Sequence, residues 1–257
     1  MSGVFVNIPV HNNLKSVEEC IAAVVDACEY AERDYTISVV DDHSDSETLS
    51  GLIELNNIYF AHMVLMHTKL RTKSPSPNLG LAVNMGLEAF QYSGCDWFWN
   101  VETDVYPQRT CLAELIYALE QQPEVGMACP LFIDPEKKKT RHVFPGPEGI
   151  ALAGQPIEVA PQDTRYVPWH HAGANIVPGE IAKDPRCRVD ESFKLWCCDF
   201  DWAWCVEDIF EKKLLYVGKA QAVHVGCMSS SKVDRDSFES ETEANRRVRE
   251  KWHREHL

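Results

Sequence analysis

Short runs of apolar and β-branched residues alternate with amphipathic stretches through the first half of the chain. Runs of strand length that end in polar or turn residues predict strands, here at residues 4–10, 36–40, 63–66, 96–101 and 125–132. Apolar residues spaced three and four apart predict helices between them, at residues 17–28, 79–92 and 110–120. A chain that alternates strands with helices favours an α/β fold with helices on both faces of a mostly parallel sheet.

The first predicted helix has a start signal of its own. Ser16 followed by Glu19 matches the capping-box pattern, in which two side chains bond two backbone N–H groups of the first turn. The apolar positions at helical spacing come directly after it. The pattern therefore predicts that this helix begins at Ser16.

Residues 134–169 interrupt the regular pattern. They contain Pro135, Pro145, Pro147, Pro156, Pro161 and Pro168, with basic residues at 137–139 and 141. We expect a long irregular excursion, and loops of this length usually serve a function. Regular patterning resumes at residues 174–177, predicts strands at 214–217 and 222–225, and predicts a polar helix at 237–256. There is no internal repeat and no linker, which indicates one domain.

Composition and charge narrow the classes of protein. The chain has 257 residues with 45% hydrophobic and 25% charged, and 39 acidic against 25 basic residues give a formal net charge of −14. That charge repels polyphosphate and anionic lipid, and so disfavours non-specific nucleic-acid or membrane-surface binding. The ten cysteines form no CxxC pair, and no apolar run reaches the ~20 residues that span a bilayer. The first ten residues lack a basic region followed by a continuous apolar stretch, so we expect no signal peptide. We expect free thiols, a cytoplasmic location and no transmembrane segment.

Acidic residues close two of the predicted strands. Asp41 and Asp42 follow one strand, and Glu102 and Asp104 follow another. Ligands of parallel sheets bind beyond the carboxyl ends of the strands, so these carboxylates lie where a ligand is expected. Two carboxylates two residues apart point to the same side, an arrangement that suits Mg²⁺ or Mn²⁺. For an isolated acidic pair, however, a solvated turn is the commoner explanation.

Two further features come late in the chain. Asp199 and Asp201 lie among Trp196, Phe200, Trp202 and Trp204, where partial desolvation would raise a carboxylate pKa and favour general-base chemistry. The alternative is a helix N-terminus that Asp199 caps. His224 ends an apolar strand, where a packed histidine is commoner than a metal ligand. These features become informative only together with the acidic strand ends.

In their order and spacing, these residues resemble the family 2 inverting glycosyltransferases with the GT-A fold. I-P-V-H-N at residues 8–12 is similar to the family's I-P-V-Y-N start, and V-V-D-D-H-S at 39–44 resembles its V-V-D-D-x-S. Residues 78–86, N-L-G-L-A-V-N-M-G, look like its N-x-G-x-x-x-A-x-N-x-G stretch. N-V-E-T-D-V at 100–105 parallels its metal-binding motif.

The resemblance continues to the end of the chain. Gly173-Ala174-Asn175 is similar to the family's G-A-x segment, and C-D-F-D at 198–201 stands where the family has E-D-x-D. V-H-V-G at 223–226 resembles its closing V-x-H-x-G, and N-R-R through K-W at 245–252 its terminal N-R-x(n)-K-W. Three positions depart from the pattern: Glu102 and Asp104 exchange carboxylate lengths, Cys198 replaces Glu, and His11 replaces Tyr.

The resemblance implies inverting transfer of a sugar from a nucleoside-diphosphate sugar to an acceptor hydroxyl. It makes Asp199 the catalytic base and assigns Mn²⁺ or Mg²⁺ to Glu102, Asp104 and His224. The nucleotide is expected at Pro9, His11, Asn12, Asp41, Asp42, Asn78, Gly80 and Asn84. The donor sugar and acceptor are expected at Glu102, Trp169, Gly173, Ala174, Asn175 and Asp201.

A UDP-sugar is the favoured donor, with dTDP- and GDP-sugars as alternatives. The acceptor is a glycan or another hydroxyl compound, including a hydroxymethylated DNA base, although the net charge disfavours nucleic acid. Two other classes stay open: a sugar-1-phosphate nucleotidyltransferase and a non-catalytic nucleotide-sugar-binding module. Within one GT-A domain over residues 1–257, we expect a nucleotide-sugar half at 1–132, an acceptor and catalytic half at 133–230, and a helical tail at 231–257.

Overall fold

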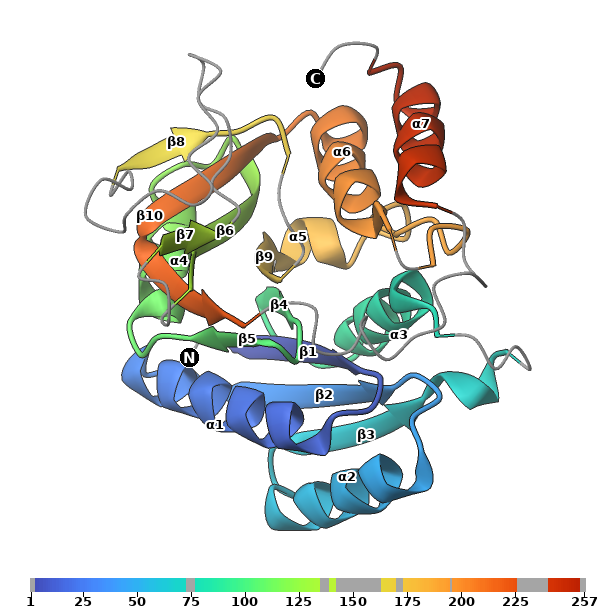
Figure 1. Ribbon diagram of the computed structural model, residues 1–257. Helices are drawn as coiled ribbons and strands as arrows, with labels where there is room; N and C mark the ends of the chain where they lie inside the picture. Colours follow the sequence, from blue (N-terminus) through green and yellow to red (C-terminus); the bar gives the residue numbers. More distant parts are fainter. Residues whose placement is uncertain are drawn as a thin grey trace.

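A mixed sheet of ten strands forms the centre of the computed structural model (Figure 1). The structure describes residues 3–72, 77–134, 139–141, 163–169, 173–194, 196–225 and 240–254. Along the sheet the strands follow the order β3-β2-β1-β4-β9-β6-β10-β5, while β7 pairs with β6 and β8 with β10. The strands are β1 (Val4–Val10), β2 (Tyr35–Asp41), β3 (Met63–His67), β4 (Trp97–Val101), β5 (Val105–Pro107), β6 (Val125–Asp134), β7 (Lys139–Arg141), β8 (Thr164–Tyr166), β9 (Ala174–Pro178) and β10 (Lys213–His224).

The first half of the sheet is parallel, as the alternation of elements predicts. β1 pairs in parallel with β2 and β4, and β2 pairs in parallel with β3. The second half departs from the expected mostly parallel arrangement, since β9 runs antiparallel to both β4 and β6. β5 also runs antiparallel to β10. The expected α/β class with a sheet flanked by helices is confirmed, and the sheet is mixed.

Helices cover both faces of the sheet. The helices are α1 (Leu14–Tyr30), α2 (Ser46–Ile58), α3 (Leu79–Phe90), α4 (Cys111–Glu120), α5 (Gly179–Ala182), α6 (Cys198–Phe210) and α7 (Glu241–Lys251), with a short 3₁₀ helix, η1, at Thr68–Leu70. Alternate residues of β1 serve two cores. Val4, Val6 and Ile8 pack with α1, α2 and α4, while Phe5 packs with α3 and α6.

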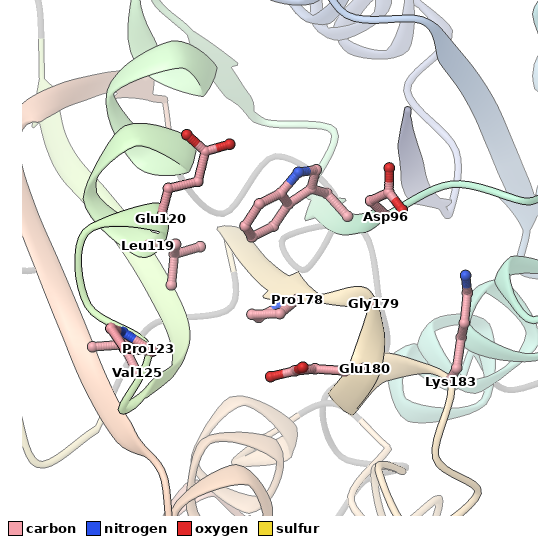
Figure 2. A pocket seen from close by; sticks show the side chains of 10 residues that line it. Asp96, Leu119, Glu120, Pro123, Val125, Pro178, Gly179, Glu180 and Lys183 are labelled. Atoms are coloured by element: carbon pink, nitrogen blue, oxygen red, sulfur yellow. The ribbon is translucent and has the colours of Figure 1, made fainter. Parts of the chain in front are cut away.

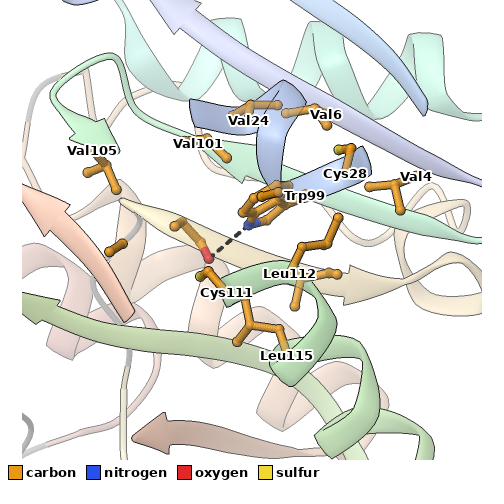
Figure 3. Close-up of a cluster of buried hydrophobic side chains, with 14 of the residues drawn as sticks. Val4, Val6, Val24, Cys28, Trp99, Val101, Val105, Cys111, Leu112 and Leu115 are labelled. Atoms are coloured by element: carbon orange, nitrogen blue, oxygen red, sulfur yellow. Dashed lines mark hydrogen bonds between the residues drawn. The ribbon is translucent and has the colours of Figure 1, made fainter. Parts of the chain in front are cut away.

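The first core is centred on a tryptophan of β4 (Figure 3). Trp99 is fully buried among Val4, Val6, Cys28 and Leu112. Its indole N–H donates to the carbonyl of Ala174 at 3.2 Å, so burial leaves no unpaired donor. This bond ties β4 to β9 beside the edge at which Glu102 follows β4.

The start of α1 differs from the prediction. The helix begins at Leu14, and Asn13 precedes it in a left-handed conformation with φ 63° and no side-chain cap. Ser16 therefore lies inside the helix, where its hydroxyl pairs with that of Tyr106 at 3.0 Å. The capping-box interpretation of Ser16 and Glu19 is wrong, because a tertiary contact takes the serine hydroxyl.

The later elements follow the predicted pattern with two differences. The strands predicted at 214–217 and 222–225 are one strand, β10, with a register shift against β6 between Val217 and Gln221. Helix α2 was not predicted, although Asp45 caps it by accepting from the Thr48 N–H at 2.8 Å. Most of the excursion at 134–169 lies outside the described residues, as do His170 and His171.

A row of polar side chains crosses the sheet on the α3 face. Asn7 on β1 lies opposite Ser38 on β2 and Asn100 on β4, and Asn100 lies opposite Asn175 on β9. All four are fully buried. The Asn7 amide donates to the Asn100 side-chain oxygen at 2.9 Å. Gly86 of α3 packs directly on Asn7, since a Cβ at Gly86 would lie 2.1 Å from the Asn7 oxygen.

We expect Gly86→Ala to lower the free energy of unfolding by about 1–3 kcal/mol, because Asn7 is buried and hydrogen-bonded and cannot move aside. Gly80→Ala in the same helix is the control. Its Cβ would meet Val189 at 3.1 Å, and the gain in helix propensity of up to ~1 kcal/mol offsets this contact. Urea denaturation measures both; equal losses would contradict the role given to Asn7.

Two further expectations concern the whole chain. Among the described residues, no helix combines the length and apolar character needed to cross a bilayer. Nine cysteines in that part of the chain are free and buried. Free thiols are therefore confirmed for those nine, whereas Cys227 lies outside the described residues.

Candidate functional site

Three predicted metal ligands meet at one edge of the sheet. One ligand atom from each of Glu102, Asp104 and His224 lies within 4.8 Å of the others. The antiparallel pairing of β5 with β10 creates this meeting, because His224 is registered with Val105 and the Val225 N–H donates to the Asp104 carbonyl at 3.0 Å. His224 Nε2 lies 3.7 Å from Asp104 Oδ2. Residues 120 positions apart in sequence thus converge through one strand pair.

The electrostatics of this cluster favour a bound cation. The pKa of Glu102 is raised well above its usual range, first by burial and then by the charges of Asp104 and Asp199. Asp104 and His224 are also buried. Two carboxylates and an imidazole form a donor set that fits a divalent metal, and such an ion would offset the repulsion between the carboxylates.

Asp199 lies in the first turn of α6. The turn before the helix is tight, since Cys197 adopts a left-handed conformation with φ 66°. Asp199 does not cap the helix as the structural alternative supposed, because Cys197 holds the N-cap position. An Asp199 oxygen accepts from the Phe200 N–H at 2.9 Å. Burial raises the pKa of Asp199 to about 6, and the charge of Glu241 adds to the rise.

A carboxylate with that pKa suits general-base work near neutral pH. The electrostatic interaction of Asp199 with Glu102 shows that the two carboxylates share one region. The edge of the sheet therefore combines a candidate cation site with a candidate base.

Asp201 has a different environment, although it lies only two positions after Asp199. It is fully buried. One oxygen accepts from the Asp190 N–H at 2.7 Å and the other from the Trp252 indole N–H at 2.7 Å. The Lys251 ammonium lies 2.7 Å from the same oxygen as Trp252. Protein donors thus occupy both oxygens of the residue that was predicted on the acceptor side.

The predicted nucleotide carboxylates lie at the end of β2, and both are buried. Asp41 accepts from the Ser44 N–H at 3.1 Å, and its other oxygen lies 3.2 Å from His67 Nδ1. Asp42 accepts from the Thr68 hydroxyl at 2.8 Å and from the Asn78 N–H. These bonds fix the carboxylates before any ligand binds.

The end of β1 lies against the end of β2. Pro9 is buried within β1 opposite Val40. His11 Nδ1 lies 2.7 Å from the Asp42 carbonyl, and His11 Nε2 lies 3.1 Å from the Asn12 amide. The Asn12 N–H donates to the Ser44 hydroxyl at 2.9 Å. The predicted nucleotide residues of the two strand ends are therefore neighbours.

The predicted nucleotide residues at and after the start of α3 contact other parts of the protein, chiefly residues 189–191. Asn78 caps the helix by accepting from the Leu81 N–H at 3.0 Å, and its amide donates to the Glu191 carbonyl at 2.9 Å. The buried Asn84 side chain both donates to the Val189 carbonyl at 2.8 Å and accepts from the Val189 N–H at 2.9 Å. Gly80 is buried next to Val189. These residues hold the 189–191 segment against α3.

The predicted donor-sugar and acceptor residues flank the metal cluster. The Gly173 carbonyl accepts from the Glu102 N–H at 2.9 Å. Ala174 and Asn175 are fully buried in β9 beside β4. The partly exposed Trp169 ring lies 4.7 Å from that of Phe200, the residue after Asp199. An aromatic pair therefore lies next to the candidate base.

Several polar residues at the carboxyl-terminal edge of the sheet were not predicted from the sequence. His67 and Thr68 contact Asp41 and Asp42, and Glu191 bonds the Asn84 amide at 3.0 Å. Position at the end of a predicted strand could have pointed to His67, since neighbouring parallel strands end together. No sequence pattern pointed to Glu191.

A cavity of about 580 Å³ lies at the opposite, amino-terminal edge of β4 and β6 (Figure 2). It is lined by Asp96, Trp97, Leu119, Glu120, Pro123, Val125, Pro178, Gly179, Glu180 and Lys183. None of the predicted site residues is among them. Because ligands of α/β sheets bind beyond the carboxyl ends of the strands, the acidic edge is the candidate site.

Comparison with known proteins agrees with this geometry. The family model described as Glycosyl transferase family 2 matches residues 5–174. The match ends before Asp199 and His224, so their roles rest on geometry. No curated protein matches the sequence.

Among solved structures, the chain is similar to "Crystal structure of GalNAc-T7 with UDP, GalNAc and Mn2+", with a TM-score of 0.70 and 13% sequence identity. The alignment covers 99% of this chain and 48% of that one, so the chain spans about half the length of that protein. At this identity the likeness shows the fold alone. Since the family match covers most of the chain, the chain belongs to glycosyl transferase family 2.

Proposed function

We propose that the protein transfers a sugar from a UDP-sugar to an acceptor hydroxyl, with metal dependence and with inversion at the anomeric carbon. The observation that carries this proposal is the convergence of Glu102, Asp104 and His224 beside Asp199, whose pKa is raised to about 6. Membership of the family supports a nucleotide-sugar donor.

Asp199 is proposed as the general base. The carboxylate takes the proton from the acceptor hydroxyl while the acceptor oxygen forms a bond to the anomeric carbon. The bond from that carbon to the donor diphosphate breaks on the opposite face, and the electron pair leaves with the diphosphate. A single displacement of this kind inverts the anomeric centre.

Glu102, Asp104 and His224 would hold the metal, which when bound neutralises charge on the leaving diphosphate. Carboxylates suit both Mg²⁺ and Mn²⁺, so the donor set of two carboxylates and one histidine fits a divalent ion of this kind. Mn²⁺ is the first ion to test, because the solved structure of similar fold contains Mn²⁺.

The nucleotide is proposed to bind over the ends of β1 and β2, at Pro9, His11, Asn12, Asp41 and Asp42. The bonds that Asp41 and Asp42 receive from Ser44, Thr68 and Asn78 pre-organise these groups. The neighbouring Asn78, Gly80 and Asn84 shape this side through the 189–191 segment.

The acceptor is proposed to be a glycan that lies against Trp169 and Phe200. Aromatic rings offer apolar faces to which the apolar faces of sugar rings can pack. The two rings are 4.7 Å apart and partly exposed next to Asp199. The net charge of −14 makes an anionic nucleic-acid acceptor the less favoured substrate.

A donor screen by thermal shift tests this proposal. A ligand that binds only the folded protein raises the Tm, and a free ligand concentration of about 100 Kd stabilises the fold by roughly 2.7 kcal/mol. We expect UDP with Mn²⁺ to raise the Tm more than UDP alone, and more than dTDP or GDP with Mn²⁺. Identical Tm values with and without Mn²⁺ would contradict a metal-dependent donor site.

The products separate the remaining classes of function. A glycosyltransferase releases UDP from the UDP-sugar when an acceptor or water is present. A nucleotidyltransferase instead exchanges free diphosphate with the nucleotide-sugar and forms a nucleoside triphosphate. A binding module produces neither UDP nor a triphosphate. Chromatography of the nucleotide products distinguishes the three.

A further inference from the structure

The buried carboxylate of Asp201 joins three parts of the chain. It lies in the first turn of α6 and accepts from the Asp190 N–H and from the Trp252 indole N–H, each at 2.7 Å. The Lys251 ammonium lies 2.7 Å from Asp201 and 3.1 Å from Asp190. We call these four residues the Asp201 cluster. Charge-assisted bonds to a fully buried carboxylate are strong and costly to lose.

Asp190 connects this cluster to the end of β2, where the nucleotide is proposed to bind. Asp190 belongs to the 189–191 segment, whose backbone bonds both ends of the Asn84 amide and whose Glu191 carbonyl accepts from Asn78. The Asn78 N–H in turn donates to Asp42. Hydrogen bonds, together with the backbone of residues 189–191, thus link Trp252 at the end of α7 to Asp42 at the end of β2.

Helix α7 also connects the cluster to the surroundings of Asp199. Helix α7 lies beside α6 (Figure 1), and its first residue, Glu241, is close enough to interact electrostatically with Asp199. Arg247 of α7 donates to the Ser192 hydroxyl at 2.8 Å and stacks over Phe193 at 4.9 Å. Helix α7 therefore touches both the helix that carries the candidate base and the loop before it.

We propose that Asp201 is a positioning residue, which locks α7 against α6 and the 189–191 segment and so sets the distance between Asp199 and the nucleotide side. This inference rests on the proposed function. Asp201 does not touch substrate in this assignment, because protein donors occupy both of its oxygens. Helix α7 becomes part of the catalytic architecture rather than an appended tail.

A purely stabilising contact would have a different signature. Its loss would lower the Tm and the fraction of folded protein, while each folded molecule would keep its normal kcat. A positioning contact acts on the folded molecule itself, since a misplacement of about 1 Å can cost up to ~100-fold in rate. The kcat per folded molecule, measured well below the Tm, separates the two.

The test is Trp252→Phe, which keeps an aromatic ring at the site and removes the indole N–H that bonds Asp201, together with the second ring of the indole. We expect UDP release from a UDP-sugar, with water or glycan as acceptor, to fall by about 10–100-fold in kcat. The KM for the UDP-sugar should change by less than about threefold, because the donor contacts are intact. Lys251→Arg, which preserves the charge beside Asp201, should retain more of the kcat than Lys251→Met.

Arg254→Met, three residues beyond the end of α7, is the control. Arg254 pairs with Glu207 and Asp208, each at 2.6 Å, and so ties the segment after α7 to α6 through residues outside the Asp201 cluster. We expect a lowered Tm and a wild-type kcat. A wild-type kcat in Trp252→Phe, or equal kcat losses in Trp252→Phe and Arg254→Met, would overturn the inference. Absence of UDP release from the wild-type protein would instead overturn the proposed function.

Discussion

Asp199→Asn is expected to lower the rate of sugar transfer by about 10²–10⁴, the usual cost of removing a positioned general base. The amide has nearly the shape of the carboxylate but cannot accept a proton at neutral pH. The Asp199 oxygen that accepts from the Phe200 N–H can be replaced by the amide oxygen, so the fold should survive. UDP binding should change little, since Asp199 contacts neither strand end that is proposed to hold the nucleotide.

The measurement is UDP release together with calorimetry of UDP binding in the presence of Mn²⁺. Asp208→Asn, the same substitution nine residues later in α6, serves as the control and should keep the wild-type rate. The wild-type product should carry an inverted anomeric centre by NMR. Transfer at the wild-type rate by Asp199→Asn, or retention of configuration, would show that the proposed mechanism is wrong.

The pH dependence follows from the same residue. Since burial raises the pKa of Asp199 to about 6, the carboxylate is mostly protonated below that pH and mostly ionised above it. Only the ionised form can act as base. The rate of transfer should therefore fall as the pH drops through about 6. The residual rate of Asp199→Asn should not show this fall.

Asp104→Asn is expected to abolish the Mn²⁺-dependent part of UDP binding. Loss of a partner outside the ligand shell already costs 10–100-fold in metal affinity, so loss of a ligand should cost at least roughly 100-fold. The fold should persist, because the Asp104 carbonyl, which accepts from Val225, is unchanged. Titration of Mn²⁺ in the presence of UDP measures the effect.

Asp96→Asn is the control for this variant. Asp96 precedes β4, whereas Asp104 follows it, and Asp96 lies exposed at the opposite edge of the sheet. It should bind Mn²⁺ and UDP as the wild type does. If Asp104→Asn also kept its Mn²⁺-dependent affinity, the metal would have to bind elsewhere.

The alternation of strands and helices made the parallel half of the sheet predictable. The runs at 4–10, 36–40, 63–66 and 96–101 correspond to β1 through β4, because buried parallel strands are continuously apolar. The direction of β9 could not be predicted. A strand as short as Ala174–Pro178 reads the same in a parallel and an antiparallel ladder, and only its neighbours decide.

Local patterns were also overridden by tertiary contacts. Ser16 fits a capping box, yet its hydroxyl bonds Tyr106, which lies 90 positions away. The three proposed metal ligands were found from their motifs, and their convergence required the pairing of β5 with β10. The motifs contain Asn78, Lys251 and Trp252, but nothing in them shows that these residues bond Asp42 and Asp201, because each partner comes from a distant segment.

The antiparallel strand β9 has a consequence for synthesis of the chain. β4, with the sequence W-F-W-N-V, gains its partner β1 as soon as it emerges, but its other edge waits for β9. At about 5–20 residues per second, the ribosome takes roughly 4–15 s to extend the chain from Val101 to Pro178. During that interval the nascent chain displays an aromatic strand edge, the kind of surface on which chains aggregate. The yield of folded protein should therefore depend on how well the exposed edge of β4 is kept from aggregating during this interval, by chaperones or by low temperature.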